Sequence, residues 1–255
     1  MSLIFKSILF SFFMVMGVQA QQSPQLLFDE ANTLLEKNQF ADAMNIYRQI
    51  EKSQQVSGAL FLNMGISATQ VDSLGLAKYY FLKSTMFETT SESATEAIEY
   101  VESQFSRQSA TLPKLPWDKA VDWLKDGPSA FGVFFISFGL LVLVVGFVLL
   151  KWFNIFNFKK LNTVVSSLSI TCILILILAF YVDYVDQRYS EAVIITTEVQ
   201  VKQKADESAD LVSLGYEGYS ITVDHKISKE ASGWIYIRLG NGQFGWIKSS
   251  GVKIL

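Results

Sequence analysis

Two long runs of uncharged, mostly apolar residues constrain this chain more than any other feature. Residues 131–150 contain no charged side chain, and residues 163–182 form a second uncharged run of the same length. Twenty helical residues at 1.5 Å each span about 30 Å, which is the thickness of the hydrocarbon core of a bilayer. The pattern predicts two transmembrane helices, in preference to a buried hairpin inside a soluble protein.

The charges around these runs predict an orientation. The connecting loop, residues 151–162, carries Lys151, Lys159 and Lys160 and no acidic residue, so the positive-inside bias places it in the cytoplasm. The N-terminal residues 1–20, with Lys6 before a short apolar stretch and Ala20 before polar residues, are typical of a signal peptide. An uncleaved anchor would give the same topology. We therefore expect an inner-membrane protein with two spans, whose regions on either side of the hairpin lie outside the cytoplasm, on the periplasmic side.

Composition argues against several functional classes. The formal charge is −3, so no basic face for a nucleic acid is indicated. The only cysteine, Cys172, lies in an apolar run, and the only histidine, His225, lies in a polar segment expected to be a solvated turn. We find neither a nucleophile elbow nor a phosphate-binding loop. No catalytic residue, metal site or cofactor is predicted, and the chain is expected not to be an enzyme.

A sequence period of about 34 residues organises the segment before the apolar runs. Ala43 and Ala77 are one period apart, and small, aromatic and aliphatic residues recur with them. The two sets are Leu27, Ala31, Leu34, Phe40, Ala43, Tyr47 and Ile50, and Phe61, Gly65, Ala68, Leu74, Ala77, Phe81 and Ser84. Residues 24–57 and 58–91 thus resemble two tetratricopeptide repeats, with Gln55 and Ser84 departing from the usual pattern. Residues 93–105 are expected to form a capping helix, which ends this domain at residue 107.

The tetratricopeptide resemblance implies a binding surface. Such repeats bind peptides or proteins along the concave face of their first helices. The residues that would line that face are Phe28, Asn32, Leu62, Ile66 and Thr69. Each of them is also compatible with plain packing or surface. Two repeats fall below the three or so usually needed for stability, so a partner or the membrane is expected to supply additional surface.

Residues 108–130 combine a polar linker with a short amphipathic helix. Trp117, Ala120, Val121 and Leu124 share one helical face, with Trp123 at its edge. Two interpretations stay open. The helix lies on the outer headgroup layer of the bilayer, or it is a buried helix of the repeat domain.

The residues after the second apolar run, 183–255, have the pattern of a small all-β domain. Strands are expected at 192–195, 199–202, 219–223, 234–239 and 244–247, which are rich in β-branched and aromatic residues. The Gly233-Trp234 pair, the Asn241-Gly242 turn and the Gly245-Trp246-Ile247 run resemble the bacterial SH3 family, which implies a small barrel. Residues 240–245 also satisfy GxGxxG, but a hairpin is expected there because strands flank Asn-Gly on both sides.

Aromatic residues are the candidate binding groups of this domain. They are Tyr216, Tyr219, Trp234, Tyr236, Phe244 and Trp246. Alternation places Trp234 and Tyr236 on one face of their strand and Ile235, Ile237 and Leu239 on the other. The aliphatic face is the better core candidate, which leaves the rings outward for an extended ligand. The alternative is that the rings themselves pack as core.

The order of these segments resembles the BatE family of the Bacteroides aerotolerance (Bat) operon. This resemblance implies a multidomain membrane protein: an all-α repeat domain, a two-helix transmembrane hairpin and an all-β SH3-like barrel. It also implies other membrane or periplasmic proteins as partners, among them von Willebrand A-domain Bat proteins, and a part in aerotolerance or envelope stress. We expect a scaffold of this kind. The alternative is a sensor that binds peptidoglycan or peptides through the SH3-like domain, against which the short cytoplasmic loop argues.

Overall fold

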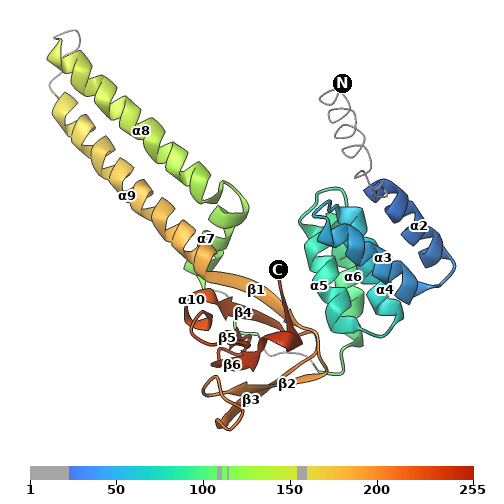
Figure 1. The fold of residues 1–255 in the computed structure, drawn as a ribbon. Coiled ribbons are helices and arrows are strands. Elements are labelled where there is room, and N and C mark those ends of the chain that lie inside the picture. The colour runs from blue at the N-terminus through green and yellow to red at the C-terminus, as the bar shows by residue number, and fades with distance from the viewer. Residues whose placement is uncertain (1–22, 108–110, 114, 154–159) are drawn as a thin grey trace, which may run out of the picture. The chain divides into compact units, whose positions relative to one another are not determined.

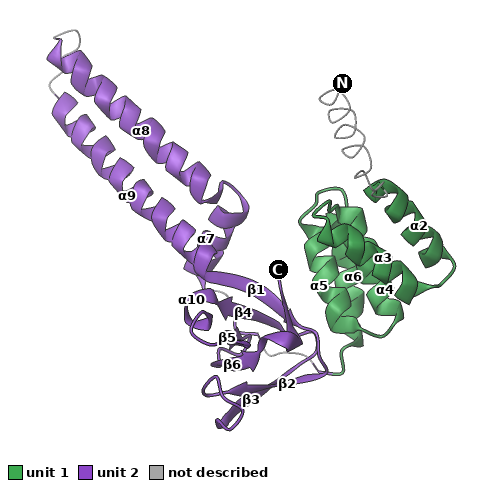
Figure 2. Ribbon diagram, in the orientation of Figure 1, with its two compact units in different colours: residues 1–106 green, residues 107–255 purple. Residues whose placement is uncertain are grey.

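The computed structural model describes residues 23–107, 111–113, 115–153 and 160–255. It divides into two compact units, residues 1–106 and residues 107–255 (Figure 2). The predicted signal peptide at residues 1–20 and Lys159 of the predicted loop lie outside the described residues.

The described part of the first unit consists of helices, which confirms the predicted helical character of this region. They are α2 (Pro24–Glu36), α3 (Phe40–Lys52), α4 (Gly58–Gln70), α5 (Leu74–Thr85) and α6 (Ser91–Gln104) (Figure 1). Helices α2 and α4 start one sequence period apart, as do α3 and α5. Helix α2 packs on α3, and α4 packs on α5. The sequence period therefore corresponds to two similar helical hairpins.

The tight turns inside the two hairpins repeat the same backbone conformation. Asn38 and Asp72, again one period apart, both have a positive φ, of 61° and 57°. Asparagine and aspartate tolerate this left-handed region better than other residues that carry a Cβ. The backbone N–H of the residue that follows each of them donates to a carbonyl in the last turns of the preceding helix, Gln39 to Leu34 at 2.9 Å and Ser73 to Ala68 at 3.0 Å. These bonds end the first helix of each hairpin in the same way.

Small residues let the helices approach closely. Ala31, Ala43 and Ala77 are fully buried. A Cβ added to Gly65 would lie 2.4 Å from the ring of Phe81, so a larger residue would displace that ring. The positions predicted from the period to be small are therefore positions at which a larger side chain lacks space.

Ser84, which departs from the repeat pattern, uses its hydroxyl to join two helices. It is fully buried, and its Oγ donates to the backbone carbonyl of Gly58 at 2.9 Å and contacts Thr90 Oγ1 at 3.0 Å. This bond ties the end of α5 to the start of α4. A buried hydroxyl that finds partners avoids the cost of an unsatisfied polar group, which is about 1–3 kcal/mol.

The second unit begins with helices α7 (Pro116–Asp126), α8 (Ser129–Trp152) and α9 (Leu161–Arg188). Helices α8 and α9 are long and apolar enough to cross a membrane, and they pack side by side (Figure 1). Their 24 and 28 residues correspond to about 36 and 42 Å, longer than the predicted spans and longer than a hydrocarbon core. The last turns of α9 therefore continue beyond the apolar run.

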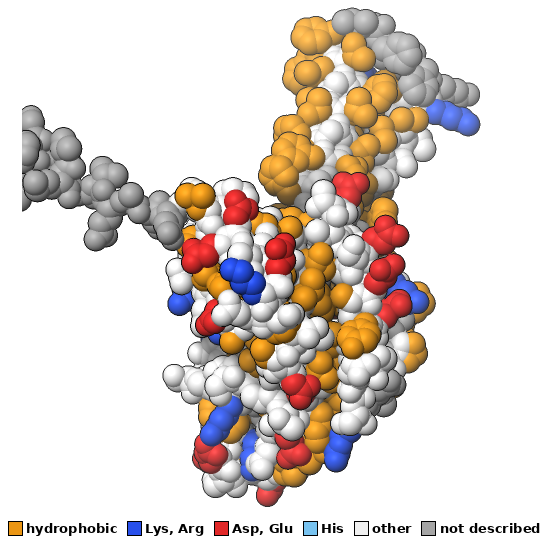
Figure 3. Space-filling model, turned by 90° about the vertical axis from the view of Figure 1, so that its right-hand side faces the viewer, with side chains coloured by type: hydrophobic (Ala, Val, Ile, Leu, Met, Phe, Trp, Pro, Cys, Tyr) orange, Lys and Arg blue, Asp and Glu red, His pale blue; other side chains and the backbone are white. Residues whose placement is uncertain are grey.

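A reciprocal pair of hydrogen bonds joins the two apolar helices near their middle. Ser137 Oγ donates to the carbonyl of Cys172 at 3.0 Å, and Cys172 Sγ donates to the carbonyl of Ser137 at 3.3 Å. Both side chains are buried between the helices. Ser169 and Thr171 bond back to carbonyls of their own helix. Many large apolar side chains of the hairpin are exposed, such as Phe131 at 70%, and Figure 3 shows them along one face.

Helix α7 packs on α8 and α9 and belongs to the second unit. Val121 and Leu124 are half-buried there, and Lys125 forms a 3.1 Å ion pair with Asp186 of α9. The helix has no buried residue, and Trp117 and Trp123 are 64% and 68% exposed. Helix α7 is therefore not a buried helix of the repeat domain. Its place on a bilayer surface stays a prediction.

The C-terminal part of the second unit is an antiparallel sheet, which confirms the predicted β character of this region. Its strands are β1 (Tyr189–Ile194), β2 (Glu198–Lys202), β3 (Leu211–Tyr216), β4 (Ser220–Asp224), β5 (Trp234–Leu239), β6 (Phe244–Lys248) and β7 (Val252–Ile254), and they pair in the order β3-β2-β6-β5-β4-β1-β7. The short helix α10 (His225–Ser228) and a 3-10 turn (Ser249–Gly251) connect some of them. Strands β3 and β7 were not among the expected strands.

The sheet core is aliphatic. Ile237 and Leu239 of β5 are buried and Ile235 packs against the same cluster, so the aliphatic face of this strand points inward as expected. The Asn241-Gly242 pair forms the turn between β5 and β6, with Gly242 at φ +86° and its N–H donating to Leu239 at 2.9 Å. The GxGxxG segment is thus a hairpin with strands on both sides, and the residues described after it contain no helix that could hold a phosphate.

Helix α9 ends at Arg188, and strand β1 starts at the next residue. An ion pair fixes this junction between the helix and the sheet. Arg188 donates to Asp224 Oδ2 through Nε at 2.9 Å and through Nη2 at 2.7 Å. The other carboxylate oxygen accepts the backbone N–H groups of Lys226 and Ile227, at 3.0 and 3.1 Å. Burial acts to raise the pKa of Asp224, but these hydrogen bonds and the charge of Arg188 hold it below its ordinary value.

His225 differs from the expectation of a solvated turn. It is half-buried at the start of α10, and its Nε2 lies 2.9 Å from Ser190 Oγ. The histidine therefore adds a contact between α10 and β1, next to the Arg188–Asp224 pair that joins α9 to β4.

Candidate functional site

The predicted groove residues of the helical unit fall into two groups. Phe28 and Asn32 of α2 contact Tyr47: the rings of Phe28 and Tyr47 are 6.0 Å apart, and Tyr47 Oη donates to Asn32 Oδ1 at 2.7 Å. Asn63 also donates to Asn32 Oδ1, at 2.8 Å. Burial raises the pKa of Tyr47 to about 12, so its hydroxyl remains a donor at neutral pH. Asn32 thus serves the packing of the first hairpin against α4.

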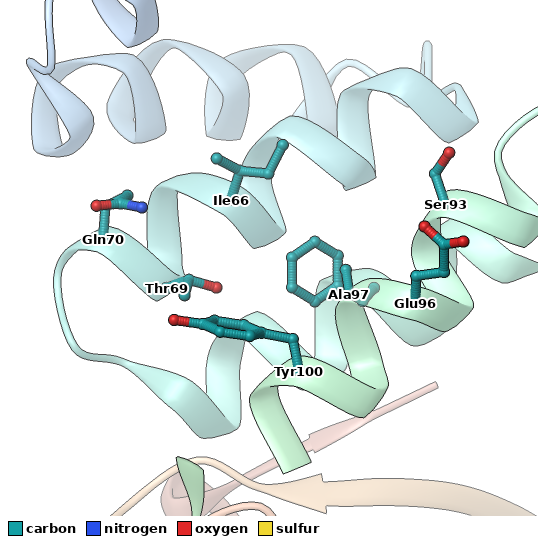
Figure 4. A pocket seen from close by; sticks show the side chains of 8 residues that line it. Ile66, Thr69, Gln70, Ser93, Glu96, Ala97 and Tyr100 are labelled. Carbon is teal, nitrogen blue, oxygen red and sulfur yellow. The ribbon is translucent and has the colours of Figure 1, made fainter. Parts of the chain in front are cut away.

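Ile66 and Thr69, in contrast, line an open pocket of about 380 Å³, and Leu62 is half-buried on the same helix. Figure 4 shows Ile66, Thr69 and Gln70 of α4 on one side and Ser93, Glu96, Ala97 and Tyr100 of α6 on the other. The buried ring of Phe81 also lines it. The pocket lies between the first helix of the second hairpin and the helix expected to be a cap.

The interior of the pocket is mainly apolar and its edge is polar. Ile66 and Ala97 are half-buried, and Tyr100 is 60% exposed with its ring toward the pocket (Figure 4). Thr69 Oγ1 already donates to the carbonyl of Gly65 at 2.9 Å. Glu96 is the one ionisable carboxylate among the lining residues, and it is exposed. The site can accept an apolar group and a positive charge beside it.

The α6 side of this pocket was missed by the sequence analysis, although the sequence contains a usable signal. Adding one more period to Leu62 and Ile66 gives Glu96 and Tyr100. Helix α6 begins almost one full period after the start of α4, so it occupies the position of the first helix in a third copy. The prediction of a capping helix at 93–105 accounts for the residues that pack inward, such as the buried Ala94 and Val101, and not for those that line the pocket.

The predicted aromatic residues of the sheet also form separate groups. Tyr236, Phe244 and Trp246 are neighbours on β5 and β6, with ring centroids of Tyr236 6.2 Å from Phe244 and 5.3 Å from Trp246. Phe244 is 52% exposed, and Arg238 lies over its ring at 5.6 Å. Trp234, half-buried, is the register partner of Lys248.

The other two rings lie elsewhere. Tyr216 and Tyr219 form an edge-to-face pair at 5.7 Å, and the guanidinium of Arg107 lies over Tyr216 at 4.1 Å. The ring of Tyr216 is thus in contact with a residue of its own chain, which precedes helix α7. Among the six predicted rings, only Phe244 is exposed, and it belongs to the Tyr236–Phe244–Trp246 group.

Within the part of the chain that the structure describes, no group of three or more His, Cys, Asp or Glu side chains is placed to hold a metal ion. No protein-family model matches the chain, and no curated protein matches it significantly. What is established is therefore a class of architecture: a helical, repeat-like region, two helices able to span a membrane, and an antiparallel sheet.

Proposed function

We propose that this protein is a membrane-anchored, non-enzymatic scaffold that binds other envelope proteins outside the cytoplasm. The observation that carries the proposal is the open pocket between α4 and α6 in a unit built from two similar helical hairpins. Stacked hairpins of this kind present extended surfaces to partner proteins. The proposal treats the helical unit as tetratricopeptide-like and the sheet as SH3-like. No step in it requires a catalytic group or a cofactor.

The resemblance to the BatE family extends this proposal to a partner class. In that case the scaffold works in a Bat-type complex, with von Willebrand A-domain proteins among its partners. Helices α8 and α9 anchor it in the inner membrane, and the helical repeats and the sheet face the periplasm.

The proposed orientation predicts the outcome of a reporter experiment. A reporter that fluoresces only in the cytoplasm should be active when fused after Asn157, which lies outside the described residues, and inactive when fused after Ser106 or at Leu255. The reason is the lysine-rich, acid-free composition of the loop at 151–162. Fluorescence from cells that express either of the last two fusions would contradict the orientation.

A second candidate function rests on an aromatic group of the sheet in which Phe244 is exposed and Tyr236 and Trp246 are half-buried. Tyr236, Phe244 and Trp246 form a contiguous aromatic group with Arg238 beside it. Small β-domains bind extended ligands against such surfaces. On this proposal the sheet binds peptidoglycan or its peptides, and the protein reports on the cell wall.

One pair of measurements separates the two functions. The scaffold proposal predicts that the full-length chain, purified in mild detergent after in-cell cross-linking, carries specific membrane or periplasmic proteins and is not retained by purified cell wall. The sensor proposal predicts the reverse, with retention lost in Tyr236→Ala because that ring contacts both neighbours. A chain that carries no partner and is retained by cell wall would eliminate the scaffold.

A further inference from the structure

We infer that the pocket between α4 and α6 binds a partner segment in which an apolar side chain stands next to a lysine or arginine. This inference rests on the proposed scaffold function and names the chemistry of its partner. The apolar side chain enters the pocket, and Glu96 of α6 pairs with the neighbouring cation.

The shape and lining of the pocket favour an apolar side chain. Its volume of about 380 Å³ is at the lower end of the range for small-ligand sites, and the pocket is open to solvent. Phe81, Ile66 and Ala97 give it an apolar lining, and the exposed ring of Tyr100 stands at its edge. An exposed tyrosine at a concave site is a frequent anchor for a partner side chain.

The charge around the pocket is negative. Helix α4 has no charged residue, and α6 has Glu92, Glu96, Glu99 and Glu102 and neither lysine nor arginine. Glu102 is paired with Lys78 at 2.8 Å, whereas Glu92, Glu96 and Glu99 are exposed. Residues 23–106 as a whole have eleven acidic and five basic side chains, a formal charge of −6.

This arrangement discriminates between cationic and anionic partners. None of the lining residues is a lysine, arginine or histidine, so a carboxylate entering the pocket would lose hydration without gaining a counter-charge. The threonine hydroxyl is already used as a donor within its own helix. A cation beside the apolar anchor instead approaches Glu96 on the pocket edge and the ring of Tyr100, which also attracts cations.

The test uses the full-length chain in nanodiscs and a random heptapeptide library displayed on phage. We expect the selected sequences to share an apolar residue adjacent to lysine or arginine. Binding of a selected peptide should fall at least tenfold in Ala97→Trp, which fills the pocket, and about threefold to fivefold in Glu96→Gln, the upper part of the range for an exposed ion pair. Higher salt should weaken binding to the native chain more than binding to Glu96→Gln.

Matched variants keep the test decisive. Glu36→Gln changes an exposed glutamate at the end of α2, away from the pocket lining, and should leave peptide binding unchanged. Tyr100→Ala removes an exposed ring without filling space, and should weaken binding even if Ala97→Trp disturbs the fold. Selection of acidic peptides, the absence of any selected peptide, or unchanged binding in both Ala97→Trp and Tyr100→Ala would overturn the inference.

Failure of the pocket inference and failure of the scaffold function would give different results. If cross-linked partners are retained by the Ala97→Trp chain, the scaffold function stands and the pocket is not its contact. If the native chain carries no partner while selected peptides still bind the pocket, the pocket chemistry stands and the scaffold function fails.

Discussion

Replacing Ala77 by tryptophan is expected to unfold the second helical hairpin. Ala77 is fully buried on α5, which packs on α4. Overpacking of a close contact costs about 1–3 kcal/mol and sometimes more, and a tryptophan adds far more volume than the one or two methylenes that cause such losses. Hydrogen–deuterium exchange of the full-length chain, followed peptide by peptide, should show loss of protection over α4 and α5. Ala43→Trp should do the same over α2 and α3.

The matched control places the same side chain on the surface. Lys52 is exposed in the last turn of α3, so Lys52→Trp should leave protection within about twofold of the native chain, as surface substitutions change stability by about 0.5 kcal/mol or less. Equal protection in Ala77→Trp, Ala43→Trp and Lys52→Trp would mean that the repeat register is misaligned.

The helical hairpins were predictable because the information is local and repeated. The same small and aromatic positions recur after one period, and a helix that packs against its sequence neighbour needs few long-range contacts. The pocket was only half predictable. Ile66 and Thr69 belong to the repeats, but Glu96 and Tyr100 lie on α6, where the period continues without the small residues that mark it in the first two copies: Ala31 and Gly65 correspond to Glu99.

Two strands of the sheet, β3 and β7, were not predicted from the sequence pattern. Strand β3 contains Gly215 and has Leu211 and Val212 exposed at 53% and 38%, so it lacks the alternation that identifies a half-buried strand. Strand β7 is short and is held by pairing with β1, the first strand of the same sheet in chain order. Such partners depend on long-range topology, which no local pattern reports.

The junction between α9 and the sheet was likewise unpredictable, and it carries the second large effect. Asp224→Ala should destabilise the sheet by about 3 kcal/mol, the lower end of the range for breaking a buried ion pair, because Arg188 is partly exposed and can be hydrated. The substitution also removes the acceptor for the N–H groups of Lys226 and Ile227. In hydrogen exchange this loss corresponds to protection in β4 and β5 falling by about two orders of magnitude.

Two companions of this variant separate its causes. Asp224→Asn keeps an acceptor for the helix α10 N–H groups and loses the charge, so its effect should be intermediate. Asp210→Ala removes an exposed carboxylate in the same domain and should be close to neutral. Because the folded pKa of Asp224 is depressed, its contribution is fully present above the ordinary aspartate pKa of about 4 and is lost as pH falls below it toward the folded value. The difference in stability between the native chain and Asp224→Asn should therefore shrink on acidification below about pH 4. A difference that is constant from about pH 7 to about pH 3 would show that the Arg188–Asp224 pair does not hold the sheet to helix α9.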